Sequence, residues 1–161
     1  MSDVRIGTGY DSHRFEAGGP MRLGGVDLPV DFHCAGHSDG DAIAHAVTDA
    51  ILGAAALGDI GTMFPDNDPA NRNRDSMEML GLAVARIHES GWRVGNVDVT
   101  VVAQKPRVGP HREAMRERLA AVLQVGIHDV FVKGKTNELL GWIGREEGLA
   151  VMAVATIRLP R

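Results

Sequence analysis

Apolar residues recur at the spacing of an α-helix in three stretches of the chain, and glycine or proline marks an end of each stretch. The spacing predicts a helix over 41–57, ended by Gly58, and a second helix over about 75–90, ended by Gly91. A third predicted helix begins near Pro110. The buried stripe of this third helix is expected to comprise Met115, Leu119 and Val122.

Other stretches have the alternation or the continuous apolar run that is typical of β-strands. The predicted strands are 4–15, 21–30, 93–104, 130–133 and 149–159. We expect the second of them to be the return arm of a hairpin, with a turn or bulge at Gly24 and Gly25. The last strand is apolar on both faces, which favours a central position in a sheet.

The segments between these elements read as connections. Residues 62–74 contain two prolines and three asparagines and are expected to be a loop, and a short helix is expected within 138–145. No repeat or Pro- or Ser-rich linker divides the chain, so we expect a single domain over residues 1–161. The order of elements predicts an α/β or α+β sandwich with one mixed sheet and helices packed on one face.

Composition narrows the class of protein. Of the 161 residues, 44% are hydrophobic and 24% are charged, as in ordinary globular domains, and the net charge of −4 argues mildly against nucleic acid as a partner. No apolar run reaches the ~18 residues of a membrane span, and the N-terminal residues do not resemble a secretory signal, so a cytoplasmic location is expected. The single cysteine, Cys34, excludes an internal disulfide and a Cys-rich metal site.

Three residues have the chemistry of metal ligands. Asp11 and His13 are two apart on an extended segment and so share one face, and His45 lies on an Ala-rich helix between Asp41 and Asp49 at helical spacing. One carboxylate and two imidazoles with a fourth position open describe a catalytic zinc site, in which Asp41 or Asp49 can orient the imidazole. A polar strand face and a hydrogen-bonded core histidine are the alternative interpretations.

Two further stretches suggest phosphate chemistry. Residues 37–41 are polar and lead into a predicted helix N-terminus, where free N–H groups favour anions. Residues 133–138 combine cations, a hydroxyl, an amide and Glu138, which suits a diphosphate and a hard cation such as magnesium. The acidic, glycine-containing stretch 58–68 is either part of a site or only a turn.

The chain resembles the methylerythritol cyclodiphosphate synthases over nearly its whole length. The matching blocks are GYDSH (9–13), AGHSDGD (35–41), His45 to Asp49, AALGDIG (55–61), FPDND (64–68), GNVDVT (95–100), AQKP (103–106) and GREEG (144–148). The resemblance implies a metal-assisted enzyme of the non-mevalonate isoprenoid pathway. In its reaction, the 2-phosphate of 4-diphosphocytidyl-2-C-methyl-D-erythritol 2-phosphate attacks the β-phosphorus of the same molecule, a cyclic diphosphate forms and CMP leaves.

The resemblance also implies roles for individual residues. Zinc would be held by Asp11, His13 and His45, and a second cation, magnesium or manganese, by Glu138. Residues implied around the erythritol phosphate and the sugar-like portion are His37, Ser38, Asp59, Gly61, Phe64, Asp66 and Asp68. Residues implied for the cytidine and the diphosphate are Ala103, Lys105, Pro106, Arg107, Lys135, Thr136, Asn137 and Arg145, with Thr136 also expected to act in catalysis. The family's Thr-Thr-Thr-Glu loop reads Lys135-Thr136-Asn137-Glu138 here.

The resemblance further implies a homotrimer with active sites between subunits, and an apolar last strand that needs a cover on both faces is consistent with this expectation. Two other functions remain as alternatives. One is a zinc-dependent phosphodiesterase that uses water as its nucleophile, and the other is a zinc- or nucleotide-binding protein without catalysis.

Overall fold

The computed structural model describes residues 3–160, in which the strands form a five-stranded sheet and a separate two-stranded hairpin. The strands are β1 (Val4–Ala17), β2 (Met21–Leu23), β3 (Val26–Leu28), β4 (Phe32–Cys34), β5 (Arg93–Val102), β6 (Val130–Lys135) and β7 (Gly148–Arg158). The large sheet has the order β4-β1-β7-β5-β6. Its β5–β6 pair is parallel and its other pairs are antiparallel, so the sheet is mixed.

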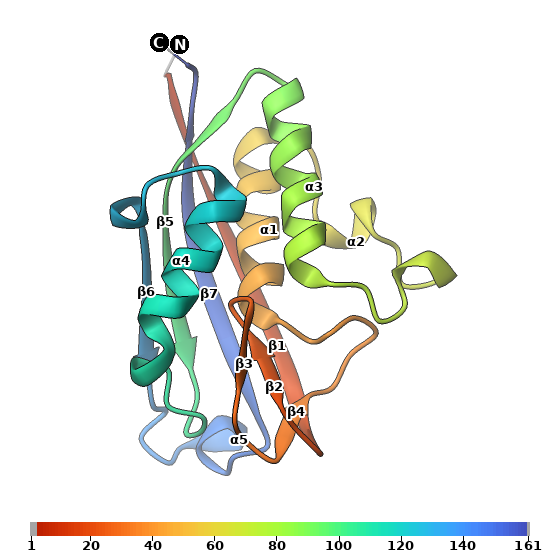
Figure 1. Cartoon of the computed structure of the whole chain (residues 1–161), viewed down its shortest axis with the longest axis vertical. Helices are drawn as coiled ribbons and strands as arrows, with labels where there is room; N and C mark the ends of the chain where they lie inside the picture. Colours follow the sequence, from red (N-terminus) through yellow and green to blue (C-terminus); the bar gives the residue numbers. More distant parts are fainter. Residues whose placement is uncertain (1–2, 161) are drawn as a thin grey trace.

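Helices cover one face of this sheet (Figure 1). The helices are α1 (Ala42–Ala55), α2 (Ile60–Met63), α3 (Ser76–Glu89), α4 (Arg112–Leu123) and α5 (Gly141–Gly144), with short 3-10 turns η1 (Pro69–Asn71), η2 (Gly109–His111) and η3 (Ile127–Asp129). Of these, α1, α3 and α4 lie on the sheet and enclose an apolar core. The α+β class with one mixed sheet and helices on one face is therefore confirmed. No described helix is both long and apolar enough to cross a membrane.

Within residues 3–160, no helix lies on the opposite face of the sheet, and several large apolar side chains are exposed there. Large exposed side chains lie on it in alternate positions of β1 and β7: Ile6, Tyr10, Met152 and Val154. Their neighbours in sequence on the other face, such as Val151 and Ala153, are buried under the helices. The predicted central position of the last strand is confirmed, because β7 lies between β1 and β5.

Two glycines allow α1 to lie directly against β1. A Cβ added at Gly7 would come within 1.9 Å of the Ala50 carbonyl oxygen, and one added at Gly9 within 1.8 Å of the Ala46 carbonyl oxygen. No other residue type fits at such a distance, so the two glycines set the spacing between strand and helix. This close approach brings the first turns of α1 next to the middle of β1.

The main differences from the prediction concern residues 21–34. This region is not the return arm of a hairpin with the first strand: β2 and β3 pair with each other around the Gly24–Gly25 turn. The strand that returns along the end of β1 is β4, which the sequence did not reveal because it is only three residues long. The predicted loop 62–74 contains the end of α2 and the turn η1.

Candidate metal centre and substrate pocket

Asp11, His13 and His45 meet as the sequence predicted. The Oδ2 atom of Asp11 lies 2.8 Å from His13 Nε2 and 3.0 Å from His45 Nδ1, and the two nitrogen atoms are 3.4 Å apart. Asp11 and His13 project from the helix-covered face of β1, and His45 comes from the first turn of α1. The three residues are partly buried, so the group lies in a recess between the strand and the helix.

The spacing of these atoms fits a single metal ion. Ligands at about 2.0–2.1 Å from a tetrahedral zinc ion would be separated by roughly 3.3 Å, and the observed spacings of 2.8–3.4 Å are close to this value. Among the described residues, Cys34 does not belong to the group of ligand atoms that lie within 4.8 Å of one another, and burial raises the pKa of its thiol to about 12. The group therefore offers one carboxylate and two imidazoles, which can hold a divalent cation.

The protonation of the group is set by its own contacts. Burial alone would raise the pKa of Asp11, but hydrogen bonds from His13 and His45 outweigh burial and lower this pKa to about 2. Burial likewise opposes a charge on His13, yet the hydrogen bond to Asp11 raises the pKa of His13 above its ordinary value. Without a metal ion, the site therefore favours an anionic Asp11 and a protonated His13.

The outer ring nitrogen of each histidine has a defined partner. His13 Nδ1–H donates to the Ala35 carbonyl oxygen at 2.6 Å, which leaves Nε2 to face Asp11. His45 Nε2 lies 2.8 Å from the hydroxyl of Ser76 and 3.0 Å from that of Ser38. Sequence reasoning missed Ser76, because this residue is 31 positions from His45 and only folding brings them together.

The prediction that Asp41 or Asp49 orients His45 is wrong. Asp41 is fully buried and accepts hydrogen bonds from the N–H groups of Gly24, Gly25 and Ala44, so it caps α1 and attaches the β2–β3 turn to it. Asp49 accepts from Ile60 N–H at 2.8 Å. Helical spacing correctly placed both residues on the face of His45, but the backbone donors of nearby loops take their carboxylates.

The other predicted residues of the N-terminal half lie in loops beside α1. His37 is exposed and Ser38 is half-buried in the loop that leads to the ligand helix. Asp59 and Asp68 cap the short helices α2 and η1, which supports the turn interpretation of the stretch 58–68. Phe64 is buried, with the Arg74 guanidinium 5.2 Å from its ring centre. Gly61 and Asp66 are exposed, and substrate contact at these positions stays a prediction.

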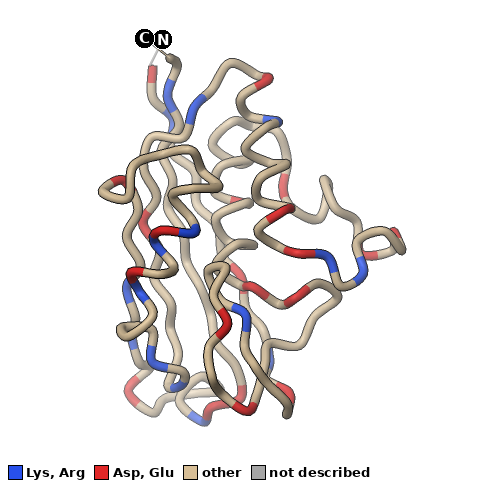
Figure 2. The backbone as a smooth tube through the Cα atoms, viewed as in Figure 1, with Lys and Arg blue, Asp and Glu red and all other residues tan. Residues whose placement is uncertain are grey.

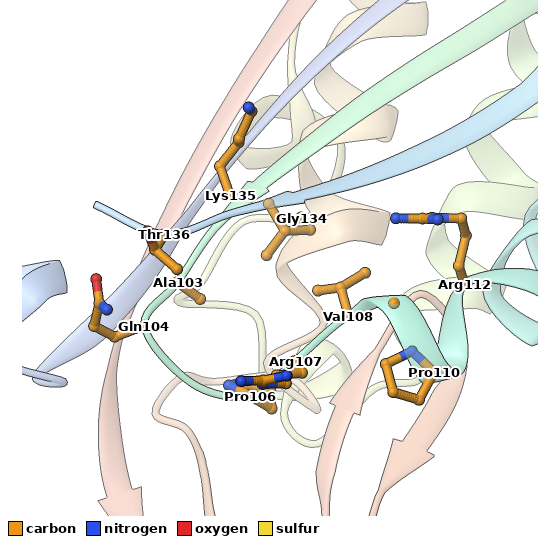
Figure 3. A pocket seen from close by; sticks show the side chains of 12 residues that line it. Ala103, Gln104, Pro106, Arg107, Val108, Pro110, Arg112, Gly134, Lys135 and Thr136 are labelled. Atoms are coloured by element: carbon orange, nitrogen blue, oxygen red, sulfur yellow. The ribbon is translucent and has the colours of Figure 1, made fainter. Parts of the chain in front are cut away.

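A second group of predicted residues surrounds a pocket of about 480 Å³ at the ends of β5 and β6 (Figure 3). Its lining includes the predicted residues Ala103, Pro106, Arg107, Lys135 and Thr136. Gln104, within the predicted stretch 103–107, also lines it, and so do Val108 and Arg112, which were not predicted. Apolar walls with a few cations suit a nucleoside that carries phosphates.

Two predicted binding residues make ion pairs instead of lining the pocket. Lys105 Nζ lies 3.2 Å from a carboxylate oxygen of Glu146, and Arg145 Nε lies 3.2 Å from one of Glu147. Both pairs are solvent-exposed, so they are weak and do not prevent either cation from meeting a phosphate.

The side chain of Gln104, which lines the pocket, forms hydrogen bonds with the loop that follows β6. Gln104 Oε1 accepts hydrogen bonds from the backbone N–H groups of Asn137, at 3.0 Å, and Leu139, at 3.3 Å. Between these donors, the exposed Glu138 adopts a left-handed backbone with φ of +51°. The Gln104 amide therefore fixes a bend that presents the Glu138 carboxylate to solvent.

The metal centre and the pocket belong to different parts of the sheet. Among the described residues, none before Val101 lines the pocket, which lies at the β5–β6 edge, whereas the metal ligands lie on β1 and α1 towards the β4 edge. Figure 2 shows acidic residues along the loop before α1 and several basic residues where β6 and α4 meet beside the pocket. Within one chain, the candidate metal site and the pocket with cationic side chains therefore lie apart.

A mixed sheet with helices on one face, a carboxylate–imidazole cluster that can hold a divalent cation and a separate pocket with cationic side chains define the class of this α+β protein. The chain belongs to the YgbB family, whose model matches residues 4–158. A relative from Gemmatimonas aurantiaca is 71% identical over 96% of this chain and 93% of its own length, and one from Thioalkalivibrio sulfidiphilus is 55% identical over 98% of each chain. Both are named 2-C-methyl-D-erythritol 2,4-cyclodiphosphate synthase.

Solved structures agree with this assignment. The bifunctional IspDF from Campylobacter jejuni superposes with a TM-score of 0.94 at 40% identity, and it covers 98% of this chain and 42% of its own. IspF from Plasmodium falciparum, described as a CDP complex, has a TM-score of 0.87 at 34% identity over the whole of both chains.

Proposed function

We propose that the protein converts 4-diphosphocytidyl-2-C-methyl-D-erythritol 2-phosphate into 2-C-methyl-D-erythritol 2,4-cyclodiphosphate and CMP, in the non-mevalonate route to isoprenoids. The observation that carries the proposal is the convergence of Asp11, His13 and His45 in a chain 71% identical to a relative of that name. The pocket at β5 and β6 supports it, because a neighbour of the same fold is described in complex with CDP.

The three ligands are proposed to hold zinc, which their nitrogen and oxygen donors suit. Bound there, zinc would supply a Lewis acid that polarises a phosphoryl oxygen. Glu138 is proposed to hold magnesium or manganese together with the diphosphate of the substrate, since an exposed carboxylate of this kind suits such cations. For Glu138→Gln, we expect unchanged zinc content and a weaker response of turnover to added magnesium.

The remaining residues are proposed to position the substrate. Its nucleophile is its own phosphate, so the protein supplies no base and instead holds two anionic groups close and in line. Ser38 accepts from Gly40 N–H and lies beside His45 Nε2, so its own hydroxyl proton can point to a phosphate oxygen next to His37. Arg107 and Lys135 in the pocket offset the charge of the leaving CMP.

We further propose a homotrimer in which the metal centre of one subunit faces the pocket of the next. The uncovered sheet face supports this, because Ile6 is 68% and Tyr10 is 58% exposed in the single chain. The positions of the two half-sites towards opposite edges of the sheet support it as well.

The reaction is tested by following the substrate with ³¹P NMR. The proposal expects a cyclic diphosphate and CMP. A linear phosphate product would indicate the zinc phosphodiesterase, and tight binding without turnover would indicate the non-catalytic alternative.

The shared site is tested by refolding two inactive variants together, His45→Ala and Arg107→Ala. Mixed trimers contain interfaces with two intact half-sites, so partial activity should return. If each chain carried a complete site, the mixture would stay inactive, and a mass near that of one subunit in solution would contradict the trimer.

A further inference from the structure

Ser76 holds His45 from outside the ligand set, and the direction of its hydroxyl proton can be deduced. The side chain of Ser76 is fully buried at the start of α3, and its Oγ lies 2.8 Å from His45 Nε2. Either group could in principle be the donor of this hydrogen bond, because a hydroxyl and a neutral imidazole nitrogen can each donate or accept. Which of them donates decides which nitrogen of His45 is free to bind a metal.

The carboxylate of Asp39 determines the direction of the hydrogen bond between Ser76 and His45. Its carboxylate meets Ser76 at two points: Oδ2 accepts from Ser76 N–H at 3.1 Å, and Oδ1 accepts from the Ser76 hydroxyl in a short hydrogen bond. A carboxylate can only accept, so the hydroxyl proton of Ser76 points to Asp39. Asp39 is itself held in place, since Oδ1 also accepts from Asp41 N–H at 3.1 Å.

The direction of the Ser76 hydroxyl determines which nitrogen of His45 faces the metal centre with a lone pair. Because the Ser76 hydroxyl donates to Asp39, Ser76 Oγ presents a lone pair to His45 Nε2, and Nε2 must carry a proton to donate to it. His45 Nδ1 faces Asp11 and His13, and it has a free lone pair when a metal is bound. Ser38 Oγ, 3.0 Å from the same Nε2, is a second acceptor on that side. The chain Asp39–Ser76–His45 joins the loop before α1, the start of α3 and the ligand helix.

We infer that Asp39 and Ser76 are positioning residues that fix the tautomer and ring orientation of His45 for metal binding. The inference rests on the proposed function only in taking His45 as a ligand. Outer partners of ligating histidines of this kind typically contribute 10–100-fold in metal affinity. Neither residue belongs to the group Asp11, His13 and His45, and their effect passes through the imidazole of His45.

Two variants test the inference by altering different partners of the hydrogen-bond chain. Ser76→Ala removes the acceptor and leaves Ser38, so zinc affinity, measured by competition with a chelator, should fall by about 10-fold. Asp39→Ala removes the acceptor of the Ser76 hydroxyl, so this proton is free to turn to His45 Nε2, which favours the wrong tautomer. Its zinc affinity should fall further, towards about 100-fold.

A second measurement separates positioning from general damage to the fold. In the zinc-loaded protein, long-range ¹H–¹⁵N spectra should show His45 with its proton on Nε2, and this proton should exchange with water faster in Ser76→Ala. Ser90→Ala, at the other end of α3, is the matched control and should change neither zinc affinity nor the His45 signals.

The outcomes distinguish the inference from the function on which it rests. If the unaltered protein binds zinc and both variants bind it equally well, with His45 signals unchanged, the inference is wrong and the function stands. If the unaltered protein binds no zinc, the assignment of the metal centre fails, and the inference fails with it.

Discussion

The two halves of the site are built in different ways. At the metal centre, each ligand nitrogen or oxygen is partly buried and the outer atoms of both histidines have partners from the surrounding loops. At the pocket, the loop 136–139 is largely exposed, includes two successive residues with positive φ, and is held mainly through the amide of Gln104. Metal binding requires donor atoms that are held in a defined geometry by their outer partners, whereas the loop beside the pocket is ordered by few contacts.

Loss of a ligand should have the largest effect. For His45→Ala, we expect zinc content to fall close to zero and turnover to fall by roughly 10³-fold, as when a main electrostatic group is removed from an active site. Metal analysis and a turnover assay measure the two effects, and circular dichroism shows whether the fold persists. Full zinc occupancy in this variant would contradict the assignment of His45.

Asp41 should matter for stability rather than for chemistry. Asp41→Ala removes the cap of α1 and leaves the buried N–H groups of Gly24 and Gly25 without their acceptor. We expect the free energy of unfolding to fall by about 3 kcal/mol, because a lost cap costs about 1 kcal/mol and each unsatisfied buried donor costs 1 kcal/mol or more. Urea denaturation measures this loss, and Asp27→Ala, on the exposed edge of β3, is the control that should change stability little.

The Gln104 contact should affect the pocket and spare the metal centre. Gln104→Leu removes the acceptor of two backbone N–H groups, so we expect faster hydrogen exchange at Asn137 and Leu139 and CDP binding weaker by about 10-fold. Gln104→Glu keeps both acceptors, and exchange should stay slow while the added negative charge still weakens CDP binding. Equal exchange rates in the Leu and Gln forms would show that this amide does not order the loop.

Acid should weaken metal binding before it unfolds the protein. The pKa of His13 is raised by its contact with Asp11, so His13 holds a proton at higher pH than an ordinary histidine, and a metal ion must displace that proton. Zinc affinity should therefore rise with pH up to the raised pKa, and below it should fall by about 10-fold per pH unit for each proton displaced. Calorimetric titrations in buffers of different ionisation enthalpy count the released protons, and the absence of proton release would contradict the pKa direction.

The smallest effect is expected at Cys34. Its side chain is 3% exposed, and burial raises the pKa of its thiol to about 12, so almost no thiolate exists near neutral pH. The native protein should remain unmodified by a thiol reagent over hours, and it should react at once in denaturant. Fast labelling of the native form would mean that the buried position of Cys34 on β4 opens readily.

The sequence predicted a site residue correctly where its side chain is a metal-ligand type and the spacing of its neighbours defines a helix or strand face. Asp11 and His13 are two residues apart on a strand, which is enough to place them on one face, and the helix that carries His45 is evident from its apolar spacing. The predictions about Asp41 and Asp49 failed because helical spacing fixes the face of a residue but not its hydrogen-bond partner. Those partners, Gly24, Gly25 and Ile60, lie in loops whose path depends on the whole fold.

By itself, the sequence determined the order of the main elements, the α+β class, the resemblance to a family and the types of ligand. The elements and the ligand types follow from short-range spacing and side-chain chemistry, which do not depend on what a segment packs against. The resemblance rests on eight ordered sequence blocks. The tertiary structure alone decided that Ser76 reaches His45, that Gln104 holds the loop around Glu138 and that β4 returns along β1. Each of these contacts joins residues far apart in the chain, and no local pattern encodes them, because they arise only when the sheet and its helices pack together.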